Sequence, residues 1–394
     1  MLNLVKAYLT VEMSAKDFCE QVLSNDELIA FLQAHIPDSK KISDEAWESC
    51  PLNARAFAYD HFDLRRTLSV GYYALTKVSR CSTAYSMLFE LSRSYQSKRN
   101  DAYSPLYQQI SESIEKTPRL FPLNPVVACQ GVEGAYSQIA CEKIFKNPFI
   151  MYFRNFEAVF SAIEQGMCQY GILPIENSTA GSVTKVYDLM IRHNFSIVRT
   201  FRMKVDHNLL VNPGATLKDI RTIYSHEQAI NQCGDFLHDL PGINVIPVAN
   251  TAIAAEMVAK SGQKDIAALS SRSCAELYGL NCLASSVQDK DNNRTRFICI
   301  SKNMEIYPGA DKTSIMMILP HKPGALYKVL ARLYTLDINV TKLESRPIPD
   351  REFEFMFYFD LETSIYSEEY IQLICELDDL CEEFKYLGSY TEVV

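Results

Sequence analysis

The stretch Asp289–Ser301, DKDNNRTRFICIS, decides how the central part of this sequence is interpreted. Its first half is polar and prone to turns, while Phe297–Ile300 is an apolar run typical of a buried strand. At the junction, the hydroxyl of Thr295 stands between the guanidinium groups of Arg294 and Arg296. Ligand sites of open α/β folds lie at strand ends, so we expect this junction to hold a small polycarboxylate.

Around this stretch, between about residues 125 and 303, short apolar runs alternate with helical patterns. This alternation predicts helices packed on mostly parallel sheets. Its length is sufficient for two α/β lobes with a cleft between them, as in periplasmic binding proteins. One of the predicted helices is Glu227–Leu237.

The C-terminal residues 312–394 have a different pattern. After a first strand, they predict a helix over Gly324–Leu336 and strands over Ile338–Arg346 and Phe353–Leu361. An amphipathic helix over Ser367–Phe384 and a last strand over Lys385–Val393 follow. This βαββαβ order is the ferredoxin-like motif, and we expect a small regulatory domain.

The N-terminal residues 1–120 predict an all-α domain with few glycines. Two interpretations remain open for it. A structural helical bundle would use its aromatic stripes as core, whereas a catalytic helical module would need inward cations. The dense candidates for such cations are Arg65, Arg66, Lys77 and Arg80, but charges on an outer helix face look the same.

Composition limits the classes of partner. A chain of 394 residues suits two or three domains, and a formal charge of −9 argues against a general nucleic-acid binder. The 12 cysteines are scattered without zinc-type spacing, so we expect no metal site. No apolar run reaches ~18 residues, the length of a membrane span. We therefore expect a cytoplasmic protein that does not bind membranes.

Four polar loops follow predicted strands and open predicted helices. They are Gln130–Gln138 (QGVEGAYSQ), Pro174–Ser182 (PIENSTAGS), Ser225–Ala229 (SHEQA) and Asn250–Ala252 (NTA). Each has a structural alternative, because glycines make tight turns and Ser, Thr, Asn and His cap helices. Together with the segment around Thr295, the loops predict one cleft.

The chemistry of that cleft follows from what its loops contain. They hold no metal-ligand set, no phosphate loop with Lys and no Ser/His/Asp order. We therefore expect proton transfer and charge stabilisation by hydroxyls, amides and Arg, without a cofactor. Arg296 could bind a substrate carboxylate bidentately, or it could belong to a structural ion pair.

Residues 126–301 resemble the prephenate dehydratase family. The resemblance rests on several motifs in the right order. These are the glycine turn with Tyr136-Ser137, Glu176-Asn177-Ser178-Thr179 with Gly181, His207-Asn208-Leu209, Ser225-His226-x-Gln228-Ala229 with Gln232-Cys233, Thr251-Ala252, Tyr278-Gly279-Leu280 and Asn293-Arg294-Thr295-Arg296-Phe297. Residues 313–392 resemble the phenylalanine-sensing ACT domain, through Pro323-Gly324-Ala325-Leu326 and Glu344-Ser345-Arg346-Pro347.

The resemblance implies loss of CO₂ and water from prephenate to give phenylpyruvate, with arogenate left open as another substrate. It makes Thr295 the catalytic residue, as a hydrogen-bond donor to the departing hydroxyl. The implied substrate-binding residues are Tyr136, Ser137, Asn177, Ser178, Thr179, Ser225, His226, Gln228, Thr251, Ala252, Arg296 and Phe297.

The ACT resemblance implies feedback inhibition by L-phenylalanine and a homodimer or homotetramer. The residues it suggests for phenylalanine are Gly324, Ala325, Leu326, Asn339, Glu344, Ser345 and Arg346. Gly324 would let the helix start approach the ligand carboxylate.

Two other functions stay open at this point. The chain could be bifunctional, because many relatives carry a helical chorismate mutase before the dehydratase. It could instead be a non-catalytic, two-lobed sensor of an aromatic metabolite.

Overall fold

The computed structural model describes residues 105–348, 351, 354–366 and 368–393. Most of the predicted N-terminal helical domain, with its four candidate cations, lies outside these residues, and its described end is α8 (Pro105–Lys116). Residues 322–336, which include α16 (Ala325–Thr335), fall outside the compact unit of the other described residues. None of the described helices is long and apolar enough to cross a bilayer.

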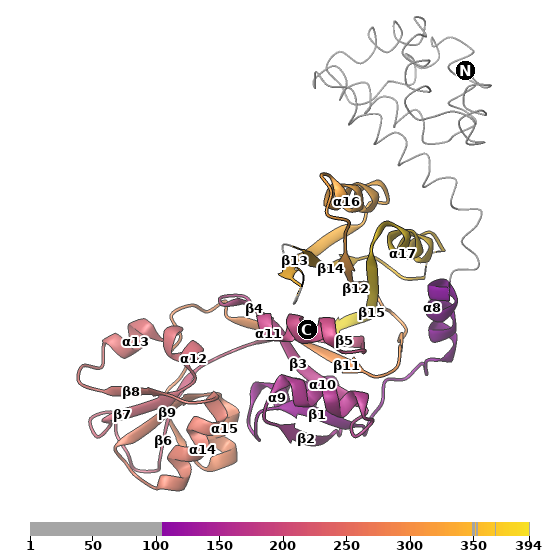
Figure 1. The fold of residues 1–394 in the computed structure, drawn as a ribbon. Coiled ribbons are helices and arrows are strands. Elements are labelled where there is room, and N and C mark those ends of the chain that lie inside the picture. The colour runs from indigo at the N-terminus through magenta and orange to yellow at the C-terminus, as the bar shows by residue number, and fades with distance from the viewer. Residues whose placement is uncertain (1–104, 349–350, 352–353, 367, 394) are drawn as a thin grey trace, which may run out of the picture. The chain divides into compact units, whose positions relative to one another are not determined.

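The first lobe is a sheet with helices on both faces (Figure 1). Its strands are ordered β5-β11-β3-β1-β2, with the short β4 paired to β3. The strands are β1 (Val126–Gln130), β2 (Phe149–Phe153), β3 (Tyr170–Asn177), β4 (Gly181–Ser182), β5 (Ser196–Lys204) and β11 (Arg294–Ser301). The helices are α9 (Tyr136–Ile144), α10 (Phe156–Glu164) and α11 (Thr184–Arg192).

Strand β11 shows why the two faces of this sheet differ. Ile298 and Ile300 pack into the core formed with α10 and α11, whereas Phe297 and Cys299 pack into the core formed with α9. Successive side chains of a strand point to opposite faces, so an unbroken apolar run belongs to a strand covered on both sides. Each such large side chain contributes roughly 1.5–3 kcal/mol when fully buried.

The second lobe is a five-stranded sheet with the order β10-β6-β9-β7-β8. Its strands are β6 (Asn208–Val211), β7 (Thr222–Ser225), β8 (Asn244–Pro247), β9 (Ile266–Ser270) and β10 (Asn281–Ala284). Its helices are α12 (Glu227–Asn231), α13 (Gly234–His238), α14 (Thr251–Ser261) and α15 (Arg272–Tyr278). The chain enters this lobe after β5 and returns to the first lobe as β11 (Figure 1).

The expected two-lobed α/β architecture is present, but the sheets are mixed. Strand β11 runs antiparallel to both β3 and β5, and β6 runs antiparallel to β9 and β10. Strand β11 is antiparallel to β5 because the chain leaves the first lobe after β5 and returns to it as β11. The expected helix Glu227–Leu237 is also broken, because α12 ends at Asn231 and α13 begins at Gly234.

The C-terminal residues contain β12 (Lys312–Ile318), α16, β13 (Asn339–Pro347), β14 (Phe355–Glu362), α17 (Glu368–Leu380) and β15 (Glu383–Val393). This is the expected βαββαβ order, with the strands arranged β13-β14-β12-β15. The last helix ends before the expected Phe384, because Glu383–Tyr390 pairs with β12 as a strand. Assignment to the ACT family stays a prediction.

The C-terminal sheet continues the sheet of the first lobe. Residues Thr391–Val393 of β15 run parallel to Arg199–Phe201 of β5, which joins both into one ten-stranded sheet. The apolar core is shared as well, because Tyr358 and Leu387 belong to the same buried cluster as Ile298. The first lobe and the C-terminal region therefore share one sheet and one core.

Gly388 lies where β15 crosses from β12 to the first lobe, and it yields a test of this junction. Its φ is +134°, and an added Cβ would lie 2.3 Å from the carbonyl oxygen of Ile197. We expect Gly388→Ala to lower the free energy of unfolding by more than about 3 kcal/mol, because both strain and overlap result. Urea denaturation followed by fluorescence measures the change.

The matched control is Gly242→Ala. Gly242 also has a positive φ, +84°, but nothing lies within 4 Å of its added Cβ. It should therefore lose only about 1–2 kcal/mol, the cost of a left-handed residue. Equal losses in the two variants would contradict a tight junction at Gly388.

Candidate functional site

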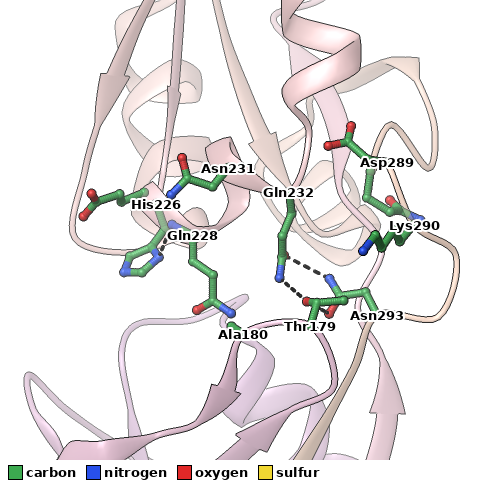
Figure 2. A pocket seen from close by; sticks show the side chains of 11 residues that line it. Thr179, Ala180, His226, Gln228, Asn231, Gln232, Asp289, Lys290 and Asn293 are labelled. Carbon is green, nitrogen blue, oxygen red and sulfur yellow. Dashed lines mark hydrogen bonds between the residues drawn. The ribbon is translucent and has the colours of Figure 1, made fainter.

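A cavity of about 410 Å³ opens between the two lobes. The first lobe contributes Thr295, Phe297 and Asn177, and the second lobe contributes residues from the starts of α12 and α14. Thr295 and Phe297 are two residues apart on β11, so both side chains face the cavity. A second cavity, of about 530 Å³, is drawn in Figure 2. His226, Gln228 and Gln232 line both cavities.

The orientation of the Asn177 amide is fixed by its surroundings. Its Oδ1 accepts hydrogen bonds from the backbone N–H of Thr179, at 3.1 Å, and of Ala180, at 2.9 Å. Because a backbone N–H can only donate, the other end of the amide is the NH₂ group. That Nδ2 donates to Thr295 Oγ1 at 2.9 Å and to Asn293 Oδ1 at 2.7 Å.

This bond determines what the hydroxyl of Thr295 can do. The hydroxyl oxygen accepts from Asn177, and a hydroxyl carries one further proton that it can donate. No described residue accepts that proton. Thr295 is buried, 9% exposed, and lines the cavity. Its free donor capacity is therefore available to a ligand in the cavity.

Four side chains form a closed hydrogen-bond ring that joins the lobes. Asn177 Nδ2 donates to Asn293, Asn293 Nδ2 donates to Gln232 Oε1 at 3.0 Å, and Gln232 Nε2 donates to Thr179 Oγ1 at 2.7 Å. The hydroxyl of Thr179 closes the ring on Asn177 Oδ1 at 2.7 Å. Figure 2 shows Gln232 reaching from the second lobe to Thr179 and Asn293. The break between α12 and α13 places Gln232 at this position.

His207 extends the ring on the second-lobe side. Its Nε2 lies 3.0 Å from Gln232 Oε1, whose role as an acceptor is set by Asn293, so Nε2 carries the proton. Nδ1 is then an acceptor, and this buried atom has no hydrogen-bond partner among the described residues. Burial lowers the pKa of His207, which keeps its imidazole neutral near neutral pH.

Several predicted binding residues line the cavities. Tyr136, Ser137, Asn177, His226, Gln228, Thr251 and Phe297 line the 410 Å³ cavity, and Thr179 lines the adjoining one. His226 also caps α12, because its Nδ1 accepts from the backbone N–H of Gln228 at 3.2 Å. The His226 side chain therefore both lines the cavities and caps a helix.

Three predicted residues do not line either cavity for local reasons. Ser178 Oγ accepts from the backbone N–H of Arg294 and donates to the carbonyl oxygen of Asn292, so it fixes the start of β11. Ser225 is fully buried and donates to the carbonyl oxygen of Leu269. Ala252 packs in the core of the second lobe. Their roles are structural in this arrangement.

Arg296 points away from the cavity, which corrects its interpretation as a carboxylate ligand. It is adjacent to Thr295 on the strand, so it faces the other side of the sheet. There its Nη2 lies 2.5 Å from Asp360 Oδ2, and the residue is 5% exposed. Burial lowers the pKa of Arg296, but the charge of Asp360 together with Tyr358, Tyr390 and Glu176 raises it by more, so the guanidinium stays charged. Arg296 therefore belongs to a structural ion pair with Asp360, which was the other interpretation of this residue.

Two cations that the sequence analysis missed line the cavity instead. Arg154 follows β2, and Lys185 lies in the first turn of α11. Both are exposed, and no ion pair or hydrogen bond joins either side chain to another described residue. The run FIMYF before Arg154 could have been recognised as a strand from its β-branched and aromatic residues. Lys185 carries no comparable signal.

The residues proposed for phenylalanine lie at the start of α16 and on β13. Gly324, Ala325 and Leu326 are at the start of α16, where Gly324 has a φ of +84°. Asn339 donates to Glu362 at 3.0 Å, and Ser345 is exposed. Glu344 accepts from Ser182 of the first lobe, and Arg346 pairs with Asp188 of the first lobe. Glu344 and Arg346 are therefore engaged within the chain.

Comparison with known proteins decides the family. Residues 127–305 match the family model described as prephenate dehydratase. The chain is 37% identical over 294 residues to an arogenate dehydratase/prephenate dehydratase from Arabidopsis thaliana, covering 72% of this chain and 75% of the relative. The chain belongs to the prephenate dehydratase family.

Two further relatives of this prephenate dehydratase family member extend the comparison. A bifunctional chorismate mutase/prephenate dehydratase from Escherichia coli is 32% identical over 279 residues, covering 69% of this chain and 72% of the relative. The solved structure of a prephenate dehydratase from Arthrobacter aurescens, in complex with L-Phe, has 26% identity and a TM-score of 0.62. That likeness covers 68% of this chain and 89% of the other. Family membership confirms the resemblance of residues 126–301 to prephenate dehydratase and favours an enzyme over a non-catalytic sensor.

Proposed function

We propose that the protein catalyses the decarboxylating dehydration of prephenate to phenylpyruvate. The bond between the ring and its carboxylate breaks, CO₂ leaves, and the electron pair moves through the ring. The bond from the ring to its hydroxyl then breaks, and the departing oxygen takes up one proton to leave as water. The aromatic product supplies the driving force, so the enzyme has to orient the dianion and stabilise the departing hydroxyl.

The observation that carries this proposal is the geometry of Thr295. Its oxygen accepts from Asn177, so its proton is directed to a hydrogen bond with whatever occupies the cavity. A free threonine is a very poor acid, so Thr295 stabilises the departing oxygen by a hydrogen bond. The proton consumed in the reaction comes from solvent.

The substrate carboxylates require cations, and Arg154 and Lys185 are suitably placed. Both line the cavity that contains Thr295, from different elements of the first lobe. Phe297, Phe156 and the ring of Tyr136 supply apolar surface for the substrate ring in the same cavity. The arrangement accounts for a dianionic ligand in a protein of net charge −9.

Arogenate, which carries an amino group in place of the side-chain keto group, is a second candidate substrate. The name of the Arabidopsis relative includes both activities. Chorismate mutase activity is a separate alternative, supported by the name of the Escherichia coli relative. Residues 1–104 are not described, so supplying the full chain with chorismate is the direct test of that activity.

We further propose that the C-terminal region is an ACT domain that binds L-phenylalanine as an inhibitor, in a homodimer or homotetramer. The Arthrobacter aurescens relative was solved with L-Phe, and the βαββαβ order supports the assignment. The cytoplasmic location expected from the sequence stays a prediction; the Arabidopsis relative is named as chloroplastic.

Replacing the hydroxyl of Thr295 tests the catalytic proposal. Thr295→Val keeps the shape and removes the donor, so we expect kcat to fall roughly 10²–10³-fold, the usual effect of removing one such donor. Thr295→Ser keeps the hydroxyl and should lose far less. Phenylpyruvate formation from prephenate and phenylalanine formation from arogenate are measured in parallel. Turnover of Thr295→Val at the unmutated rate would refute the assignment.

Removing either cavity cation tests how the dianion is held. We expect Arg154→Met and Lys185→Met each to raise KM by roughly tenfold with a smaller change in kcat, because each removes a charge that binds the carboxylates. Lys143→Met, an exposed lysine in the last turn of α9, is the control and should leave KM unchanged. Steady-state kinetics with each substrate give both constants. Unaltered KM in both cavity variants would exclude these two residues as carboxylate ligands.

Addition of L-phenylalanine without substrate tests the regulatory proposal. A ligand that binds only the folded protein raises its melting temperature, so we expect an increase in a thermal denaturation assay. Gly324→Val should abolish the increase, because a side chain at this helix start blocks approach of the ligand. Gly242→Val is the matched control, since both glycines have a φ of +84° and open space around an added Cβ. An unchanged melting temperature of the unmutated protein would count against the ACT assignment.

A further inference from the structure

Arg296 and Glu176, the neighbours of Thr295 and Asn177 in the chain, both contact the C-terminal sheet. In the pairing of β11 with β3, Thr295 lies opposite Asn177, and Arg296 lies opposite Glu176. The first pair faces the cavity, and the second faces the other side of the sheet. We call these the cavity pair and the buried pair. We propose that Lys342 and Asp360 of the C-terminal sheet are positioning residues that set the geometry of the cavity pair through the buried pair. This inference rests on the proposed function of Thr295.

Asp360 of β14 fixes Arg296. Its Oδ2 lies 2.5 Å from Arg296 Nη2, and the carboxylate is 1% exposed. Its Oδ1 accepts hydroxyl protons from Ser314 and Tyr358, both at 2.5 Å. Every oxygen of Asp360 is therefore engaged, and its position is determined by three strands of the C-terminal region and the first lobe. The guanidinium it holds belongs to the residue that follows Thr295.

Lys342 of β13 fixes Glu176. Its Nζ lies 3.0 Å from Glu176 Oε2 and 3.6 Å from Glu344 Oε2. The same ammonium donates to Ser182 Oγ at 2.9 Å, and that hydroxyl donates to Glu344 Oε2 at 2.7 Å. Ser182 ends the loop that contains Thr179, so Lys342 holds both the strand and the loop after it.

Within the buried pair the contact is looser. Glu176 Oε1 lies 3.5 Å from Arg296 Nε, which makes no hydrogen bond to a described residue. Attraction between the two charges persists at this distance. Their relative position therefore depends on the outer partners, Asp360 and Lys342.

Strand β3 contains a β-bulge beside the two pairs. The register shifts by one residue between Arg296 and Phe297, which leaves Ile175 without a partner opposite it. Pro174 and Asn177 line the cavity, while Ile175 packs in the core shared with the C-terminal sheet. Bulges redirect side chains in this way beside active sites. Movement of the buried pair is transmitted to the cavity pair because they are adjacent on the same two backbones.

The proposal predicts an effect on turnover rather than on binding. Thr295 stabilises the departing hydroxyl only when its proton points at that oxygen, and a displacement of about 1 Å can lower the rate roughly a hundredfold. Arg154 lies in the loop after β2, and Lys185 lies on α11. Because neither belongs to the cavity pair or the buried pair, we expect a displacement of these pairs to leave carboxylate binding unchanged.

The test compares Lys342→Met with Arg346→Met. Both cations lie on β13, bridge to the first lobe and have similar side-chain exposure, 20% and 21%. Arg346 pairs with Asp188 on α11, away from the buried pair. We expect Lys342→Met to lower kcat roughly fivefold with KM changed less than about twofold, while Arg346→Met leaves kcat unchanged. Thermal denaturation should show similar losses of stability for the two variants.

A second measurement does not depend on activity. We expect hydrogen exchange of the peptides spanning residues 170–182 and 290–298 to be faster in Lys342→Met than in Arg346→Met. Equal kcat and equal exchange in the two variants would overturn the positioning role. If the unmutated protein converts neither prephenate nor arogenate, the proposed function fails, and the exchange comparison still decides whether Lys342 holds the cavity pair.

Asp360→Asn provides an independent variant. It keeps the acceptor for the hydroxyls but removes the charge opposite Arg296, so kcat should fall by at least as much as in Lys342→Met. Removing one partner of a buried ion pair is destabilising by about 3–5 kcal/mol, so folding is checked first by circular dichroism. A folded Asp360→Asn with unchanged kcat would also overturn the proposal; if this variant does not fold, the Lys342 comparison decides.

Discussion

The alternation of side chains along β11 is the constraint on which the site depends. Thr295 and Phe297 face the cavity, and Arg296 between them faces the C-terminal sheet. One strand therefore supplies the proposed donor on one side and a buried charge on the other. A shift of a single residue in register would exchange the two sides and place a guanidinium in the cavity. The apolar residues Ile298 and Cys299, buried on opposite faces, fix that register.

The buried charge explains why the C-terminal sheet is joined so closely to the first lobe. Arg296 loses its hydration in this position, and Asp360 compensates for that loss only if the two are held in good geometry. The parallel pairing of β15 with β5 and the shared core around Tyr358 provide this rigidity. In return, the orientation of the sheet strands beside Thr295 depends on residues about 65 positions further along the chain. Catalytic and C-terminal regions are thus not independent modules.

The second lobe contributes through one bridging side chain. Gln232 accepts from Asn293 and donates to Thr179, which closes the hydrogen-bond ring with Asn177. Because the ring fixes every amide in one orientation, the Asn177 NH₂ group can only donate to Thr295. The backbone N–H groups of Thr179 and Ala180 in the first lobe set this orientation, and Gln232 of the second lobe adds to it. Separation of the lobes would release Gln232 and remove part of this constraint.

The sequence by itself determined the two-lobed α/β class, the order of the C-terminal elements and the loops that line the cavity. Apolar runs and helix caps are local signals, and family motifs such as the segment around Thr295 can be recognised from contiguous residues alone. The sequence could not decide that Arg296 faces away from the cavity, that Arg154 and Lys185 face it, or that one sheet spans both regions. Those facts depend on strand register and on pairing between residues distant in the chain, such as Arg296 with Asp360, which only the tertiary structure brings together.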